Sequence, residues 1–158
     1  MNLFSLKMLA AGGKHARSGE IVRPLETVKE NDMLPTSYCF RSNIKRWFTS
    51  DYPFGHRTNG PAIIGPDLIL WTKEGCYHRG NDKPAIIYPN QISFFQDGQN
   101  HRDRNIGPAI ITLYSAKVEF CYVHFNEFLE RATSSMTADE FHLLRQQYLN
   151  DLDPYESV

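Results

Sequence analysis

The hydrophobic and polar positions of this chain recur in a short pattern over its central part. Three apolar stretches read Pro-Ala-Ile-Ile and begin at Pro61, Pro84 and Pro108. Each is followed by turn-forming residues and then by a second apolar run, such as the Leu-Ile-Leu-Trp that ends at Trp71. Short runs of β-branched residues between turn signals are typical of strands. We therefore predict one β-hairpin in each copy of the pattern.

The second apolar runs align with one another in residue type. Three groups occupy equivalent positions: Ile69, Ile92 and Val118; Trp71, Phe94 and Phe120; and, between them, Leu70, Ser93 and Glu119. Because side chains alternate between the faces of a strand, the first two groups belong to a buried face and the third to the opposite face. The isoleucines of Pro-Ala-Ile-Ile point both ways, so we expect at least partial cover on both faces. Stacked hairpins of this kind build an antiparallel sheet with a continuous apolar face.

A His-Arg dipeptide precedes each Pro-Ala-Ile-Ile stretch. The histidines are His56, His78 and His101, at steps of 22 and 23 residues, and the gap to the following proline grows by one residue per copy. Such a length change belongs in a loop, where an extra residue costs little. We expect each His-Arg pair to tie its loop together through hydrogen bonds to backbone carbonyls.

The full unit W-x-x-x-G-x-x-H-R-x-x-G-P-A-I-I is represented from Trp71 to Ile87, with Lys83 in place of the glycine and one additional residue before it. It resembles the MORN-type repeat of small bacterial and bacteriophage proteins, and the resemblance covers residues 47–125. The fold class that we predict is mainly β with α caps (α+β): an antiparallel sheet of stacked MORN-like β-hairpin repeats with a C-terminal helix. The resemblance implies a scaffold that binds other macromolecules, since a fold of this kind does not fix one function.

The two ends of the chain differ from the centre. Residues 1–46 mix short apolar runs with Gly, Pro and charge, and predict an irregular N-terminal cap with one or two strands and a short helix. Residues 126–158 predict a helical cap and an acidic tail. Thr137 and Glu140 form a capping box, followed by an apolar stripe at helical spacing, and a shorter helix is expected at Asn-Glu-Phe-Leu-Glu-Arg-Ala. The stripe is Phe141, Leu144, Tyr148 and Leu152, and the tail carries Asp151, Asp153 and Glu156.

Composition narrows the class of protein. With 158 residues, 41% of them hydrophobic, and a formal net charge of -1, the chain is most simply one domain, or a domain in two parts, with no global bias toward nucleic acid. The cysteines Cys39, Cys76 and Cys121 form no C-x-x-C pair and suit reduced thiols. Lys7 interrupts a short apolar run near the N-terminus, which argues against a signal peptide. We expect a cytoplasmic protein, in the host cytoplasm if a phage encodes it.

The chain offers no recognised catalytic or metal-binding constellation. Equivalent positions in successive hairpins lie roughly 9 to 10 Å apart, whereas two imidazoles on one zinc bring their nitrogens within about 4 Å. His56, His78 and His101 therefore do not share an ion, and we expect no metal and no cofactor. The nucleotide-binding and hydrolase signatures are absent from the sequence, and Cys76 with His78 is a poor nucleophile-base pair. We expect no catalytic residues, with an enzyme of unrecognised type as an alternative.

A binding function remains, and its candidate residues are basic and aromatic. Arg57, Arg79 and Arg102 form a regular ladder that Arg104 could extend, with Trp47 and Phe95 as aromatic neighbours; these six residues are the candidate binding set. Arginine and aromatic side chains dominate protein interfaces, and they also hold single-stranded nucleic acid by charge and stacking. We favour a non-enzymatic module that binds a host or cellular protein, such as a phage accessory protein that inhibits or redirects a host enzyme or defence component. Single-stranded nucleic-acid binding is the alternative, and a homodimer through an open sheet edge is a further expectation.

Overall fold

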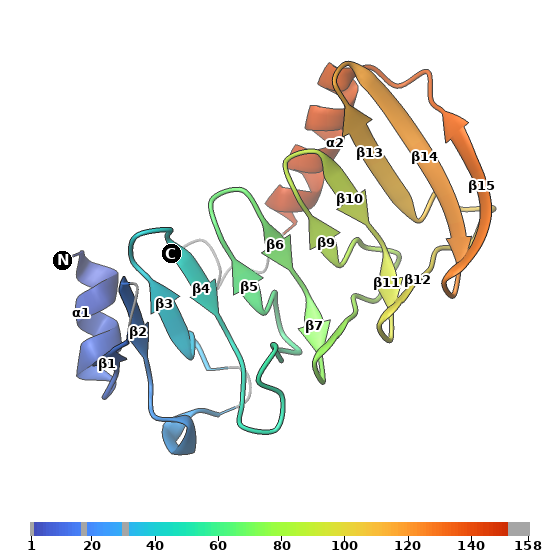
Figure 1. The fold of residues 1–158 in the computed structure, drawn as a ribbon. Helices are drawn as coiled ribbons and strands as arrows, with labels where there is room; N and C mark the ends of the chain where they lie inside the picture. Colours follow the sequence, from blue (N-terminus) through green and yellow to red (C-terminus); the bar gives the residue numbers. More distant parts are fainter. Residues whose placement is uncertain (1, 17–18, 30–31, 152–158) are drawn as a thin grey trace. The chain divides into compact units, whose positions relative to one another are not determined.

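The structure is a computed structural model that describes residues 2–16, 19–29 and 32–151. The chain forms two compact units, Met1–Gly75 (unit 1) and Cys76–Val158 (unit 2). Both units consist mainly of short antiparallel strands, and a helix follows the strands of unit 2 (Figure 1). The mainly β class with a C-terminal helix is thus confirmed. Leu152, Asp153 and Glu156 of the predicted stripe and tail lie outside the described residues.

Unit 1 begins with a helix and continues as a sheet whose strands lie side by side in sequence order. The elements are α1 (Leu3–Ala10), β1 (Lys14–His15), β2 (Glu20–Val22), the 3-10 helix η2 (Leu25–Thr27), β3 (Ser37–Cys39), β4 (Ile44–Arg46), β5 (Ile63–Ile64), β6 (Ile69–Leu70) and β7 (Thr72–Lys73). From β1 to β6 each strand pairs antiparallel with the next. The segment predicted as an irregular cap is therefore more regular than expected, because it supplies four strands and a helix.

The core of unit 1 lies between α1 and the first strands. Met8, Ile21 and Tyr38 are fully or almost fully buried and contact one another, with Phe4 and Leu9 packed beside them. Burial of apolar side chains is the main favourable term in folding, so this cluster holds an eight-residue helix that would be marginal by itself.

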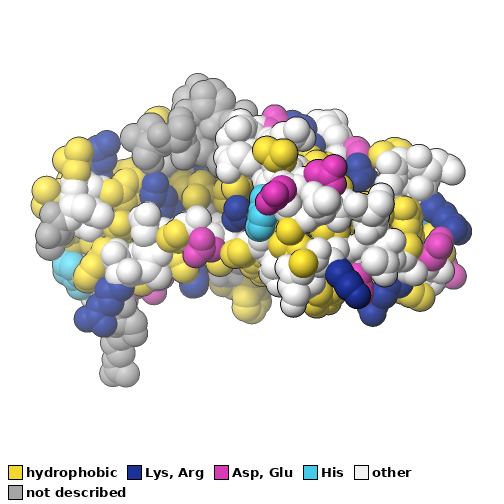
Figure 2. Space-filling model, turned by 90° about the horizontal axis from the view of Figure 1, so that it is seen from above, with side chains coloured by type: hydrophobic (Ala, Val, Ile, Leu, Met, Phe, Trp, Pro, Cys, Tyr) yellow, Lys and Arg dark blue, Asp and Glu magenta, His cyan; other side chains and the backbone are white. Residues whose placement is uncertain are grey.

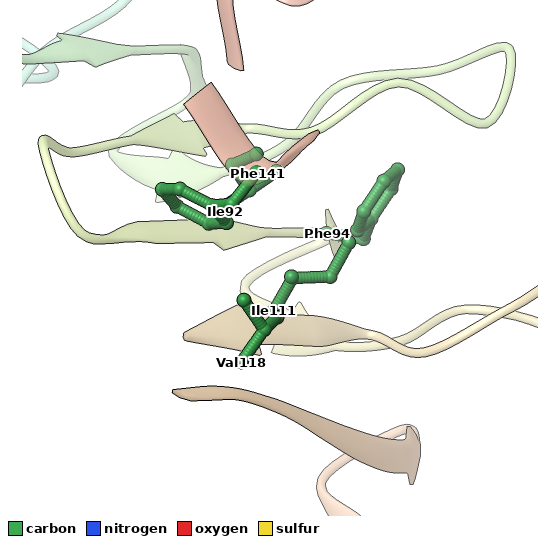
Figure 3. Packing of buried hydrophobic residues seen from close by; sticks show 5 residues of the cluster. All are labelled: Ile92, Phe94, Ile111, Val118 and Phe141. Carbon is green, nitrogen blue, oxygen red and sulfur yellow. The ribbon is translucent and has the colours of Figure 1, made fainter. Parts of the chain in front are cut away.

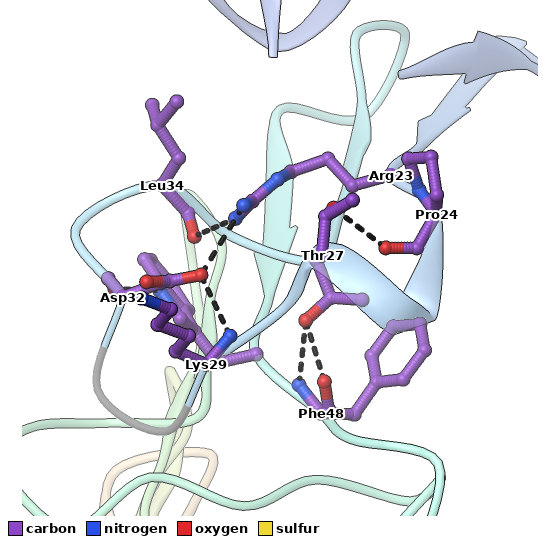
Figure 4. Close-up of polar contacts among 9 residues, drawn as sticks. Arg23, Pro24, Thr27, Lys29, Asp32, Leu34 and Phe48 are labelled. Atoms are coloured by element: carbon purple, nitrogen blue, oxygen red, sulfur yellow. Dashed lines mark hydrogen bonds and ion pairs between the residues drawn. The ribbon is translucent and has the colours of Figure 1, made fainter. Parts of the chain in front are cut away.

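The described residues between β2 and β3 form no strand, and polar contacts hold them in place (Figure 4). The guanidinium of Arg23 donates to the carbonyl oxygen of Leu34 at 3.1 Å and pairs with Asp32 at 3.2 Å. Asp32 also accepts a hydrogen bond from the backbone N–H of Lys29 at 2.9 Å. A buried guanidinium needs such partners, because its charge would otherwise be costly to remove from water.

Unit 2 contains the longer strands. Its elements are β8 (Cys76–Tyr77), β9 (Ile86–Ile87), β10 (Gln91–Ser93), β11 (Phe95–Gln96), β12 (Gln99–Asn100), β13 (Ile110–Tyr114), β14 (Lys117–His124), β15 (Glu127–Thr133) and α2 (Ala138–Asn150). One sheet has the order β9-β10-β13-β14-β15, and β11 pairs with β12 in a separate small hairpin. The hairpins β9–β10 and β13–β14 each begin at a Pro-Ala-Ile-Ile stretch, as β5–β6 does in unit 1.

Helix α2 covers one face of the unit 2 sheet (Figure 3). Its Phe141 is fully buried against Ile92, Phe94, Ile111 and Val118. The predicted capping box is confirmed: the Thr137 hydroxyl accepts from the backbone N–H of Glu140, and the Glu140 carboxylate accepts from that of Thr137. Leu144 and Tyr148 of the predicted stripe pack against the same core.

The predicted helix at Asn-Glu-Phe-Leu-Glu-Arg-Ala is wrong, because these residues form β15. Phe125 and Asn126 have φ angles of 46° and 66°, which make a two-residue turn that sends the chain back along β14. The pairing then runs from His124 with Glu127 to Glu119 with Thr133. The long-range ladder outweighs the helix propensity of this segment.

The burial of the strands agrees with the expected cover on both faces. Ile69, Ile92 and Val118 are buried, and so are Trp71 and Phe94, while Phe120 is half-buried. Leu70 and Ser93, placed by alternation on the opposite face, are also buried. Alternation therefore identifies the face that a side chain occupies but not whether that face meets water.

Candidate functional site

The three His-Arg pairs occupy equivalent loops, and their arginines make the same backbone contact. Nη1 of Arg57 donates to the carbonyl oxygen of Pro61 at 3.3 Å. Arg79 makes this bond to Pro84 at 3.2 Å, and Arg102 makes it to Pro108 at 3.4 Å. Each arginine thus closes the loop that leads into its own Pro-Ala-Ile-Ile strand, as predicted.

These arginines are packed into the protein. Arg57 is only 4% exposed, and its guanidinium lies 4.2 Å from the centroid of the Trp47 ring. The guanidinium of Arg102 lies 3.9 Å from the centroid of the Phe94 ring, and its side chain is 12% exposed. Stacking of a desolvated guanidinium on an aromatic face is attractive and fixes both groups. The ladder is therefore part of the internal scaffold of each unit.

His56 and His78 differ from the prediction, because Nδ1 of each ring accepts a hydrogen bond from a backbone N–H group. Nδ1 of His56 accepts from the N–H of Glu74 at 2.8 Å, and Nδ1 of His78 accepts from that of Asp97 at 3.1 Å. Glu74 and Asp97 each begin a turn with positive φ, and a glycine follows both. The imidazole therefore caps the backbone N–H at the start of the turn, and in the second copy a carboxylate oxygen of Asp97 also lies 3.0 Å from Nδ1 of His78.

His101 lies in a different environment from the other two. Its ring stacks on Phe125, with the centroids 3.9 Å apart and an interplanar angle of 6°, and His124 approaches edge-on with its centroid at 4.7 Å. Nδ1 of His101 is buried and has no hydrogen-bond partner among the described residues. Burial lowers the pKa of His101, the neighbouring His124 lowers it further, and Asp103 acts in the opposite direction.

A cavity of about 250 Å³ in unit 2 lies beside His101. Its walls come from the loop 79–83, the strand residues 94–96 and the loop 101–106. Phe95 and Ile106 supply apolar wall, and Ile106 is 60% exposed. The cavity thus combines an apolar lining with a polar border, which is the usual character of a binding pocket.

The charged groups around the cavity are held by partners within unit 2. Nε and Nη2 of Arg102 donate to the two carboxylate oxygens of Asp82, each at 2.7 Å. Lys83 pairs with Asp151 at 2.6 Å, and Asp103 accepts from the backbone N–H of Asn105 at 2.8 Å. A bidentate pair of this geometry orders the two loops that form the walls.

Aromatic contacts extend the cavity into a larger surface. The rings of Tyr77 and Phe95 lie 5.2 Å apart, and Phe125 is 45% exposed beside His101. We call the set Tyr77, Phe95, His101, Ile106 and Phe125 the cavity rim. No serine, threonine or cysteine is among the described residues that line the cavity, so its geometry offers no hydroxyl or thiol nucleophile beside His101.

The structure separates the candidate binding set into buried and accessible residues. Trp47 is 6% exposed, and its indole N–H donates to the carbonyl oxygen of Asp32 at 2.9 Å, so it is a structural residue of unit 1. Arg104 is exposed, forms an ion pair with Glu130 and lies 6.0 Å from the centroid of the Tyr122 ring. Arg79, Phe95 and Arg102 all line the cavity.

Sequence reasoning missed Tyr77, Ile106 and Phe125. The turn at Phe125 and Asn126 is the counterpart of the Glu74–Gly75 and Asp97–Gly98 turns, as the positive φ angles of all three show. The alignment of Trp71, Phe94 and Phe120 does not bring Phe125 to the position of Glu74 and Asp97, so the sequence alone did not mark it. No spacing marks Ile106, which lies in the loop of variable length. Tyr77 becomes part of the rim only because its ring contacts Phe95.

The described residues were compared with the requirements of a metal site and of a membrane-spanning helix. Among them, no group of three or more His, Cys, Asp and Glu side chains is placed to hold a metal ion. Within the same part of the chain, none of the helices has both the length and the apolar character needed to cross a membrane.

Comparison with known proteins leaves the family open. The chain matches no family model, and no curated protein and no solved structure is significantly similar to it. Functional inference therefore rests on the geometry of the chain and on the resemblance in its sequence.

Proposed function

We propose that this protein is a non-enzymatic protein–protein interaction module and that its partner binds the cavity rim. One observation carries the proposal: a cavity of about 250 Å³ is bordered by accessible apolar side chains, with Ile106 60% exposed and Phe125 45% exposed. Interface hot spots are bulky side chains that enter such pockets and are surrounded by polar contacts that exclude water.

The burial of the arginines supports a protein partner over nucleic acid. Arg57 and Arg102 stack on aromatic rings, and each uses its guanidinium on a proline carbonyl. Nucleic-acid binding depends on cations that reach phosphates and displace counterions. Arg104 is an exposed arginine of the candidate set, and it is paired with Glu130.

The kind of partner follows from the sequence resemblance. MORN-like repeats in small phage proteins serve as scaffolds, so we propose a phage accessory protein that binds and inhibits, or redirects, a host enzyme or defence component. Under this proposal the protein acts in the host cytoplasm and needs no cofactor. The Arg, Tyr and Phe side chains of unit 2 suit that role, because these residue types are enriched at interfaces.

An affinity capture from bacterial lysate tests the proposal. Tagged wild-type chain, the Ile106→Glu variant and the Leu143→Glu variant are compared after nuclease treatment and at two salt concentrations. Ile106 and Leu143 are matched, since they are 60% and 65% exposed and both lie in unit 2, but Leu143 is on α2 and does not line the cavity. We expect one protein to be retained by wild type and by Leu143→Glu and lost with Ile106→Glu, because a buried carboxylate without a partner opposes docking.

Two results would contradict the proposal. Equal retention by all three chains would remove the cavity rim from the interface. Retention that disappears with nuclease or with added salt would instead favour nucleic acid.

A further inference from the structure

A second surface lies on unit 1, around the outer side of α1. Helix α1 buries Ser5 and Met8 on its inner side, yet it leaves Leu3 70% exposed and Leu6 52% exposed. Phe40, which follows β3, is 41% exposed. Phe40 lines a cavity together with Asn2 and Ser5 at the start of α1, so exposed apolar side chains of the helix and of the chain after β3 belong to one region of unit 1.

A cavity lies in this surface. It has a volume of about 330 Å³ and is lined by Asn2, Ser5, His15 and Phe40. The ring of His15 stands edge-on to that of Phe40, with the centroids 6.2 Å apart. The floor is rigid, because Asn2 accepts from the N–H and the hydroxyl of Ser5 and donates to the hydroxyl of Tyr38. A preformed socket of this volume is at the small end of ligand pockets, the size that one bulky side chain needs.

The exposed charges next to the socket residues in the sequence are basic. Lys14 and Arg41 directly neighbour His15 and Phe40, Lys7 lies on α1, and all three are exposed. The sequence of unit 1 has ten Lys and Arg residues against seven Asp and Glu. Unit 2 has the opposite balance, with seven basic against eleven acidic residues. Hydrophobic and basic side chains lie on the part of unit 1 that carries α1 (Figure 2). We call Leu3, Leu6, Lys7, Lys14, His15, Phe40 and Arg41 the α1 surface.

We propose that the α1 surface docks an acidic segment of another protein, with one bulky apolar side chain of that segment in the socket. The exposed leucines provide apolar contact, and the lysines and arginine attract carboxylates on either side of the anchor. Charge of one sign around an apolar socket selects partners of the opposite sign and speeds their association. A lipid surface has less need of a rigid concave socket, since its chains adapt to any apolar contour.

This inference goes beyond the cavity rim and is independent of it. The two surfaces belong to different units, share no residue and differ in charge. The Ile106→Glu variant should therefore bind the acidic segment as wild type does, so failure of one proposal leaves the other standing.

The test uses the full chain and, as the probe, a display library of short random peptides. Selection on the wild-type chain should enrich peptides that carry several Asp or Glu residues around one Leu, Phe or Trp. A representative peptide should bind the Leu6→Asp variant roughly tenfold more weakly or worse, as the loss of an interface anchor does. Leu143→Asp, an exposed leucine on a helix of the other unit, is the matched control and should bind like wild type.

Charge is tested separately from apolar contact. The double variant Lys7→Glu/Lys14→Glu should bind the peptide much more weakly than wild type at low salt. The difference should be smaller at high salt, because salt screens the charges of the wild type and of the variant alike. The Phe40→Ala variant should weaken binding equally at both salt concentrations. Each variant changes exposed side chains, and far-UV circular dichroism with thermal unfolding verifies that it is folded.

Three outcomes would overturn the proposal. These are the absence of any enriched peptide, enriched peptides without acidic residues, and equal affinity of wild type and Leu6→Asp. Vesicles of phosphatidylserine and phosphatidylcholine are the second probe. If they bind the chain through Leu6 while the acidic peptides do not, the α1 surface belongs to lipid and the peptide proposal is wrong.

Discussion

The His-Arg dipeptide of unit 1 and the last one of unit 2 have different fates, whereas His78 of unit 2 accepts a backbone N–H as His56 does. In unit 1, His56 accepts the N–H of Glu74, and Arg57 is buried on Trp47, so both side chains help to hold the loop. In unit 2, Arg102 keeps the loop-closing bond to Pro108, but His101 stacks on Phe125 and lines a cavity. The arginine is thus constant in its role, and the histidine is not.

The turn that faces each histidine accounts for the difference. His56 meets a Glu74–Gly75 turn, whose first backbone N–H points at the ring nitrogen. His101 meets Phe125, whose aromatic ring occupies the space beside the imidazole. A repeated loop therefore becomes a candidate site through a change in its neighbour, while its own two residues stay the same.

The largest effect is expected for the arginine of unit 1. Arg57→Ala should lower the free energy of unfolding by roughly 2–4 kcal/mol, because a charge-assisted hydrogen bond and a desolvated stacking contact are lost. Urea unfolding followed by circular dichroism measures this loss and reports on both units, and the fluorescence of Trp47 and Trp71 reports on unit 1 in addition.

The control for this experiment is Arg104→Ala. Arg104 is exposed, so its removal should change the free energy of unfolding by less than about 0.5 kcal/mol. If Arg57→Ala is as mild as Arg104→Ala, the arginines are not scaffold, and the comparison between the units fails.

An intermediate effect is expected at the pair that orders the cavity walls. Asp82→Asn keeps the shape and the positive φ of residue 82 but removes the charge that Arg102 meets. The pair is partly exposed, so the loss should be about 0.5–1 kcal/mol by urea unfolding monitored with circular dichroism. Hydrogen exchange should become faster in the loops 79–83 and 101–106. Unchanged exchange there would mean that the pair does not order the walls.

The smallest effect is a dependence on pH through His101. Its pKa is lowered in the folded protein by burial and by His124, so the unfolded chain takes up the proton first as the pH falls below about 6.5. The stability contributed by the neutral ring is complete above that pH and is lost as the pH falls toward the folded pKa. Wild type should therefore lose more stability between pH 7.5 and pH 5 than His101→Gln. Parallel pH profiles for the two chains would show that His101 does not titrate in this way.

The sequence was informative where local rules act alone. The capping box at Thr137 and Glu140 and the apolar stripe of Phe141, Leu144 and Tyr148 predicted α2 correctly, because both signals lie within one helix. The loop-closing bonds of the arginines were also predicted, since each joins residues only four to six positions apart. The MORN-type resemblance and the partner remain predictions.

The errors arose where distant segments meet. The segment at Glu127–Thr133 has the residues of a helix, but pairing with β14 makes it a strand. Trp47 was a candidate for binding, yet it is buried, and its indole N–H donates to the backbone carbonyl oxygen of Asp32, fifteen residues away. The cavity rim joins Tyr77, Phe95 and Ile106 through contacts that no spacing along the chain encodes.

By itself the sequence determined the recurring strand pattern, the turn positions and the capped C-terminal helix, because side-chain alternation, backbone φ and hydrogen-bond capping depend on near neighbours. Only the tertiary structure decided which arginines are buried, that Nδ1 of His101 is buried without a hydrogen-bond partner among the described residues, and where the cavities lie. Those properties depend on which groups from distant parts of the chain pack against a side chain and form hydrogen bonds with it. The same residue type is therefore found in quite different surroundings.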